Sequence, residues 1–171
     1  MRAMLEVCVD TIEGAEAAVM GGAGRIELCS SLSEGGLTPS AGLMRAAASL
    51  PVPSYALIRP RSGLFYFSEP EVLIMLDDVR AARNAGLAGV VLGAQGPGGG
   101  LDTALLARLV AAAGDLGCTL HRVIDVVPDP LAALEQAIEL GFERVLTSGA
   151  EPFAPEGVGL IAEMVIRADG R

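Results

Sequence analysis

The chain has 171 residues with 12 basic and 21 acidic side chains, which gives a formal net charge of −9. All 12 basic residues are arginine, and the absence of lysine excludes Schiff-base enzymes and P-loop ATPases, because both need a lysine amine. A single histidine excludes a zinc site built on two or three imidazoles, and an acidic chain without a basic stripe is a poor nucleic-acid binder.

The length and composition also limit the class of protein and its cellular compartment. The length suits a single domain, spanning 1–171, with a core of ordinary size. No apolar run reaches the roughly 18 residues of a membrane-spanning helix, and Glu6 interrupts what would be the apolar stretch of a secretory signal. The three cysteines, Cys8, Cys29 and Cys118, show no CxxC spacing. We therefore expect a cytoplasmic protein with neither a membrane nor a nucleic acid as its partner.

Short apolar runs alternate with longer amphipathic ones along the chain. The short runs predict six strands, at 4–9, 25–28, 55–59, 88–92, 118–122 and 144–147. The amphipathic runs predict six helices, at 11–20, 40–50, 69–84, 102–113, 130–140 and 155–166. Helix-start signals support the second, third and fifth helices: Ser40, the pair Ser68 and Glu71, and Asp129 before Pro130.

Six strand–helix units in a row imply a parallel sheet. A complete eight-unit TIM-type (β/α) barrel typically needs about 250 residues. The six units use this chain to its end at 167–171, where a seventh strand would be expected to start. The pattern leaves two α/β architectures open: an incomplete TIM-type barrel of about six parallel strand–helix units, truncated at its C-terminus, and an open, doubly wound sheet of six strands.

Polar side chains in the predicted strands mark the place of a site. A charge facing the helix layer would be buried in an apolar interface, so such residues should face a barrel interior or lie at the carboxyl ends of the strands. Because side chains alternate along a strand, the pattern groups them in pairs. These pairs are Glu6 with Cys8, Glu27 with Cys29, Arg59 with Arg61, and His121 with Asp125, while Thr147 and Ser148 end the sixth strand.

Each pair also has a structural interpretation. Glu6 and Glu27 could neutralise the two arginines inside the sheet, and the cysteines of the first two strands could be small core side chains. His121 could equally be a structural residue or an acid–base group oriented by a nearby carboxylate.

The loop at 60–68 adds a more specific signal. It places three aromatic side chains beside Arg59 and Arg61, whereas the whole chain has two tyrosines, four phenylalanines and no tryptophan. Arginine next to aromatic walls suits a small anionic, partly apolar ligand. The loop at 30–39, with its Gly35-Gly36 pair, could hold an anion or be an ordinary polar connection.

Several motifs together resemble those of the CutC family over nearly the whole chain. They are Glu27-Leu-Cys29, Glu34-Gly-Gly-Leu-Thr-Pro-Ser40, Arg59-Pro-Arg61 with Gly63 and Phe65, His121-Arg122 with Asp125, and Leu146-Thr-Ser-Gly149. The resemblance implies a TIM-type barrel, a cytoplasmic location and a role in copper homeostasis, because the family is described as copper-binding.

The chain departs from the family pattern at three points. The last two strand–helix units expected of CutC-like chains are missing. Leu64 and Phe67 stand where such chains usually carry an acidic residue and a tyrosine, and Gln95-Gly96-Pro97 replaces a usual Asp-Gly.

The first functional hypothesis is a Cu(I) site in a copper homeostasis protein. Cys8 and Cys29 are predicted at equivalent places on neighbouring strands, so that their sulfur atoms could meet. Two thiolates are soft ligands of the kind that select Cu(I).

The second hypothesis is a TIM-barrel enzyme acting on a small anionic substrate by general acid–base chemistry of the lyase or isomerase type. Its candidate residues are Glu6, Glu27, His121 and Asp125 as acid–base groups and Arg59, Arg61 and Ser148 as anion-binding groups. Under either hypothesis an incomplete barrel would expose its edge strands, which predicts self-association into a homo-oligomer.

Overall fold

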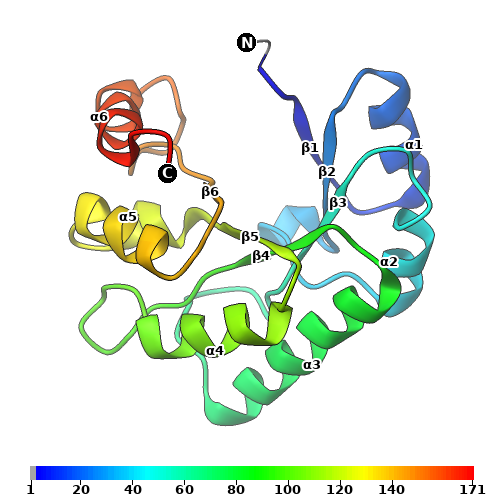
Figure 1. Ribbon diagram of the computed structural model, residues 1–171, viewed down its shortest axis with the longest axis horizontal. Helices are drawn as coiled ribbons and strands as arrows, with labels where there is room; N and C mark the ends of the chain where they lie inside the picture. The colour runs from blue at the N-terminus through cyan, green and yellow to red at the C-terminus, as the bar shows by residue number, and fades with distance from the viewer. Residues whose placement is uncertain (1–2) are drawn as a thin grey trace.

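The structure, a computed structural model, describes residues 3–171, so the first two residues of the predicted 1–171 domain lie outside it. Six strands form one sheet, and each strand pairs in parallel with the next one in the chain. Figure 1 shows that this sheet is curled rather than flat. The strands are β1 (Glu6–Val9), β2 (Arg25–Leu28), β3 (Ser54–Leu57), β4 (Gly89–Leu92), β5 (Gly117–Leu120) and β6 (Arg144–Val145).

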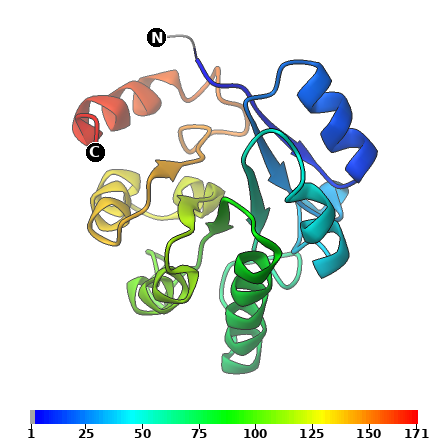
Figure 2. The same cartoon turned by 45° about the vertical axis from the view of Figure 1, so that its right-hand side comes forward.

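A helix follows every strand and lies on the outer side of the curl (Figure 2). The α-helices are α1 (Ile12–Met20), α2 (Ala41–Ala47), α3 (Glu69–Ala85), α4 (Thr103–Ala113), α5 (Pro130–Glu139) and α6 (Val158–Ala168), and short 3-10 helices occur at η1 (Leu32–Glu34) and η2 (Arg122–Val126). Within residues 3–171, none of these helices is long and apolar enough to cross a membrane. A doubly wound sheet would reverse its strand order and carry helices on both faces, so the predicted incomplete TIM-type barrel is confirmed.

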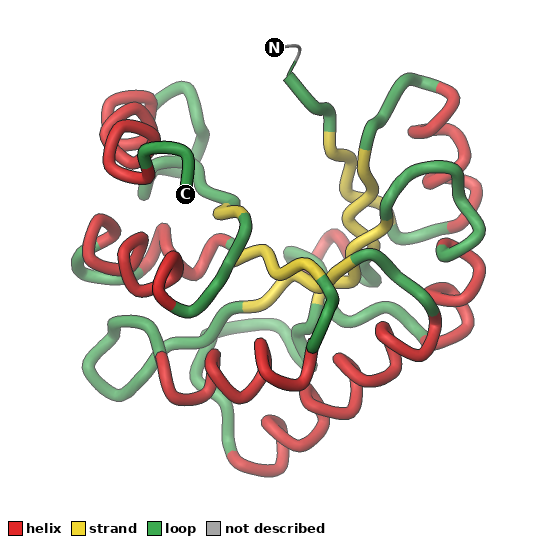
Figure 3. The backbone as a smooth tube through the Cα atoms, viewed as in Figure 1, coloured by secondary structure: helices red, strands yellow, loops and turns green. Residues whose placement is uncertain are grey.

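The sheet does not close on itself. β1 and β6 are its two edge strands, and they do not pair with each other in the described part of the chain. Figure 3 shows the strands as an open arc with helices around it. The inner face of the sheet therefore lies inside a half-barrel.

The predicted helix-start signals are confirmed by hydrogen bonds. Ser40 Oγ accepts from the N–H group of Leu43 at 3.2 Å, and Asp129 caps α5 in the same way. Before α3, Glu71 Oε2 accepts from the N–H group of Ser68 at 2.7 Å within a capping box.

Three predicted strands end two residues early in the structure, and the fifth predicted strand ends at Leu120 instead of residue 122. The third ends at Leu57 instead of residue 59, because the Arg59 N–H group donates to Thr38 Oγ1 at 2.9 Å and so leaves the sheet ladder. The sixth comprises only Arg144–Val145 instead of 144–147. Residues 59–61 and 146–148 are therefore loop residues, for which the alternation of faces along a strand no longer holds.

Side-chain alternation gives the sheet an apolar outer face and a more polar inner face. Ile26 and Leu28 are fully buried in the core cluster, and each such side chain contributes about 1.5–3 kcal/mol to folding. Glu27 lies between them in sequence and points to the other face, beside its β3 partner Tyr55. The fold thus directs the polar strand residues into the half-barrel.

Candidate functional site

A cavity of about 250 Å³ lies at the carboxyl ends of the strands. Active sites of (β/α) barrels form at this end, where the loops after the strands gather. Five predicted site residues line it, namely Cys8, Glu27, Cys29, Arg59 and His121. The remaining lining residues are Leu32, Gly35, Leu57, Phe65, Arg122 and Leu146.

Cys8, Glu27 and Cys29 form one wall of the cavity. Cys8 pairs with Glu27 in the β1–β2 register, and Cys29 comes two residues later in the chain. The prediction that the two cysteines occupy equivalent places is therefore wrong, because the register sets them one layer apart. Cys29 Sγ donates to Glu27 Oε1 across 3.8 Å, and both cysteines are free thiols. Two thiols and one carboxyl group thus form a single cluster.

Burial changes the acid–base behaviour of this cluster. It raises the pKa of Glu27 from 4.5 to about 7, and the negative charge of Glu6 acts in the same direction. Burial of the thiol and the Glu27 carboxylate raise the pKa of Cys8 to about 12, and the pKa of Cys29 rises for the same two reasons. Both thiols are therefore protonated near neutral pH, while Glu27 is partly ionised.

Glu6 lies outside the lining of the cavity. Its Oε2 atom is 2.7 Å from Arg25 Nη2, in an ion pair one layer closer to the amino ends of the strands. The structural interpretation expected an arginine partner for Glu6, but the partner is Arg25 and not Arg59 or Arg61. Its assignment as an acid–base group stays a prediction.

Arg59 and Arg61 have different surroundings. Arg59 is only 8% exposed, and its Nη atoms donate to backbone carbonyl groups at 34–36 and to that of Gly63. Arg61 turns outward, where its Nε atom donates to Glu71 Oε1 on α3 at 2.5 Å. The predicted shared face of the two arginines is therefore wrong, because both follow the end of β3. Of the two, only Arg59 lines the cavity.

His121 is a buried, neutral side chain at the end of β5. Its Nδ1 atom accepts from the Val123 N–H group at 3.0 Å and so caps η2. Burial and the positive charge of Arg59 lower the pKa of His121 from 6.5 to about 3. The neutral ring must then carry its proton on Nε2, because Nδ1 is the acceptor. The ring packs against the Gly93 backbone, and its Nε2–H group makes no hydrogen bond of normal geometry in the described part of the chain.

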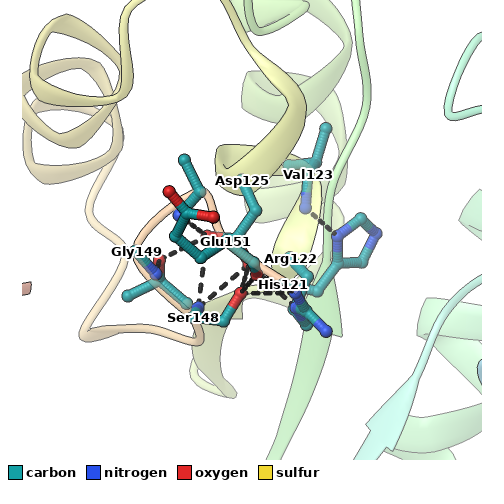
Figure 4. Close-up of polar contacts among 9 residues, drawn as sticks. His121, Arg122, Val123, Asp125, Ser148, Gly149 and Glu151 are labelled. Carbon is teal, nitrogen blue, oxygen red and sulfur yellow. Dashed lines mark hydrogen bonds and ion pairs between the residues drawn. The ribbon is translucent and has the colours of Figure 1, made fainter. Parts of the chain in front are cut away.

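Asp125 lies in η2, four residues after His121, and its hydrogen bonds hold the loop after β6 (Figure 4). Its carboxylate accepts from the Thr147 hydroxyl and from the N–H group of Ser148, and it pairs with Arg122 Nε at 2.8 Å. Burial alone would raise the pKa of Asp125, but the hydrogen bonds from Thr147 and Arg122 lower it. The expectation that Asp125 orients His121 is therefore wrong, since Asp125 lies in a 3-10 helix and bonds elsewhere.

Ser148 belongs to the same network. Its Oγ atom is 3.1 Å from Asp125 Oδ2, and it also bonds the Arg122 guanidinium and the Glu151 carbonyl oxygen (Figure 4). It is not among the residues that line the cavity. The anion-binding role of Ser148 stays a prediction.

The metal-binding capacity of the cavity rests on its sulfur atoms. Residues 3–171 contain no group of three or more histidine, cysteine, aspartate and glutamate side chains arranged to hold a metal ion. His121 is not a ligand in this arrangement, because metal-bound histidines donate their second N–H group, whereas here Nδ1 accepts and Nε2 carries the proton. The thiols of Cys8 and Cys29 remain as soft donors.

Gly93 supports the site although sequence reasoning missed it. A Cβ atom at this position would lie 2.1 Å from His121 Cε1, so only glycine leaves room for the imidazole. The available signal was a glycine directly after the apolar run of the fourth strand. The predicted placement of an aromatic ring beside Arg59 is confirmed, since the Phe65 ring lies 5.0 Å from the Arg59 guanidinium carbon.

Comparison with known proteins relates this geometry to a family. A model of the CutC family matches residues 3–171. A CutC family protein of Sinorhizobium medicae is 55% identical over 170 residues, which cover 99% of this chain and 69% of that protein. A CutC family protein of Caulobacter vibrioides is 51% identical over 170 residues, with the same 99% and 69% coverage.

Solved structures share the fold. The crystal structure of the putative copper homeostasis protein CutC from Streptococcus agalactiae matches with a TM-score of 0.93 and 28% identity, over 98% of this chain and 84% of that chain. A phosphonopyruvate hydrolase in complex with oxalate and Mg²⁺ matches with a TM-score of 0.68 over 95% of this chain and 64% of that chain. At 16% identity the second match shows the fold alone.

Proposed function

Because the chain belongs to the CutC family, we propose that it serves copper homeostasis by binding Cu(I), as cargo, between the thiols of Cys8 and Cys29. The observation that carries this proposal is that both thiols, from neighbouring strands, line one cavity and flank Glu27. Soft sulfur ligands favour Cu(I) over hard cations. The similar structure from Streptococcus agalactiae is described as that of a putative copper homeostasis protein.

The cavity also has a group that can receive a thiol proton. Both thiols are protonated without metal, so each must lose its proton when it binds a metal ion. The Glu27 carboxylate is within 3.8 Å of Cys29 Sγ and can accept one of them. A protonated Glu27 would also remove a negative charge next to two thiolates. Free thiols and Cu(I) both need a reducing compartment, so we assign this function to the cytoplasm.

The decisive experiment removes both thiols. The Cys8→Ser, Cys29→Ser double variant and the parent are compared by anaerobic competition for Cu(I) against a coloured chelator. Cys118→Ser is the matched control, because Cys118 is a free thiol that is buried like Cys29 but lies at the amino end of β5. We expect the parent and Cys118→Ser to bind equally and the double variant to lose binding. Equal Cu(I) affinity of the double variant and the parent would refute the proposal.

A further inference from the structure

Two buried N–H groups beside the cavity have no hydrogen-bond partner within residues 3–171: Arg59 Nε and His121 Nε2. The two residues are 8% and 5% exposed. A buried donor without a partner is unfavourable, and native proteins keep few of them unless water or a ligand completes the bond. Both side chains line the same cavity, so one ligand can satisfy both.

Each side chain has one nitrogen atom without any hydrogen-bond partner in the described part of the chain. Both Nη atoms of Arg59 donate to backbone carbonyl groups, at 34–36 and at Gly63, whereas Nε donates to none. The bond from the Val123 N–H group to Nδ1 fixes the His121 proton on Nε2. The pair therefore presents two unpartnered donor nitrogens and one positive charge.

The Phe65 ring is the wall that these two side chains share. Its centroid lies 4.7 Å from that of the His121 ring and 5.0 Å from the Arg59 guanidinium carbon. Neither unpartnered nitrogen is exposed to solvent, while Phe65 itself lines the cavity. Because the Phe65 ring covers both side chains, access of a ligand to the donors requires this ring to move.

We propose that the cavity binds a small organic monocarboxylate through Arg59 Nε–H and His121 Nε2–H. Its two oxygen atoms match the two donors, and its apolar part packs against Leu57 and Phe65, which line the same space. This ligand uses the donors of Arg59 and His121 and not the thiols, so the proposal does not depend on copper binding.

Charge selects a monocarboxylate over more highly charged anions. The donor pair carries one positive charge, that of Arg59, because His121 is neutral. Arg122 also lines the cavity, but its guanidinium is paired with Asp125. Because Glu27 lines the cavity too, the second negative charge of a phosphate or a dicarboxylate would face a carboxyl group and a cation that is already paired.

The single histidine of the chain makes a direct test available. In NMR spectra of protein that carries histidine labelled with a nitrogen isotope, all imidazole signals come from His121. The chemical shift of its Nε2–H proton can then be followed while metal-free protein is titrated with ligand. The probes are acetate, propionate and butyrate, with inorganic phosphate and succinate for comparison. We expect a saturable shift of the Nε2–H signal with a monocarboxylate at millimolar concentration. No saturable shift with any of the three, or a stronger response to phosphate or succinate, overturns the proposal.

Variants then separate this site from the copper site. His121→Asn keeps an acceptor for the Val123 N–H group but lacks the Nε2–H donor, so calorimetry should show propionate binding weakened on the order of tenfold to a hundredfold. Cys8→Ser, Cys29→Ser should retain the parent's propionate affinity, whether or not copper binding proves correct. Phe65→Leu should bind propionate and exchange its Nε2–H proton with water faster than the parent. Undiminished binding by a folded His121→Asn variant would contradict the assignment.

Discussion

His121 should make the stability of the protein sensitive to mild acid. Burial and the charge of Arg59 lower its pKa from 6.5 to about 3 in the folded state. Between these two values the unfolded chain binds a proton at this imidazole and the folded chain does not. The free energy of unfolding therefore falls as the pH drops below 6.5, and this contribution is constant above that pH.

The size of the effect follows from the same two values. Each pH unit inside this window removes about 1.4 kcal/mol, so lowering the pH from 7 to 5 should cost the parent about 2 kcal/mol through His121. In His121→Asn the titrating ring is absent, while the Asn side chain can still accept from the Val123 N–H group and cap η2. Lost packing against Phe65 lowers the stability of this variant by an amount that does not depend on pH.

Urea unfolding of parent and variant at several pH values between 5 and 8, followed by circular dichroism, measures the difference. Glu27 works in the opposite direction, because its raised pKa, about 7, makes both proteins lose stability as the pH rises from 4.5. That contribution is common to the two proteins and cancels in the comparison. Parallel stability curves for the parent and His121→Asn would refute a buried neutral imidazole at this position.

Three further substitutions, one of them a control in α6, test the surroundings of the site. Gly93→Ala places a methyl group against the His121 ring and should lower the free energy of unfolding by at least about 1–3 kcal/mol, whereas Gly159→Ala in α6, where nothing lies within 4 Å of an added Cβ, should raise it by about 0.5–1 kcal/mol. Equal effects in urea unfolding would contradict this. Asp125→Asn removes the charge that pairs with Arg122 and should cost about 1.5–3 kcal/mol, with faster hydrogen exchange at the Ser148 amide. Unchanged exchange there would show that Asp125 does not hold the loop.

The sequence was sufficient for the elements and the architecture because local signals specify them. Alternating strand-length and helix-length apolar runs predict six units, and capping residues such as Ser40 and Asp129 mark where helices begin. Whether the sheet curls or is doubly wound depends on strand order, which no local pattern encodes. The structure settles that question by placing the six strands in chain order.

Side-chain partners were predictable only inside the strands. Glu27 and Cys29 face the half-barrel as alternation predicts, because both are held in or directly beside the β2 ladder. Arg61 and Asp125 lie in a loop and in a 3-10 helix, so their distance in sequence from a strand residue carries no information on direction. Arg25 was missed as the partner of Glu6 because pairing across strands depends on register, and register is a property of two segments together.

The two proposals are separable because they depend on different side chains of one cavity. Copper binding needs the thiols of Cys8 and Cys29, and carboxylate binding needs the donors of Arg59 and His121. Glu27 contacts the Cys29 thiol and also contributes a negative charge to the cavity. A substitution of Glu27 would therefore disturb both kinds of binding and could not show which residues bind which ligand. The thiol double variant and His121→Asn each remove one activity and serve as the control for the other. If each substitution abolished both kinds of binding in a folded protein, thiols and donors would have to act on one shared ligand, and the division into two sites would be wrong.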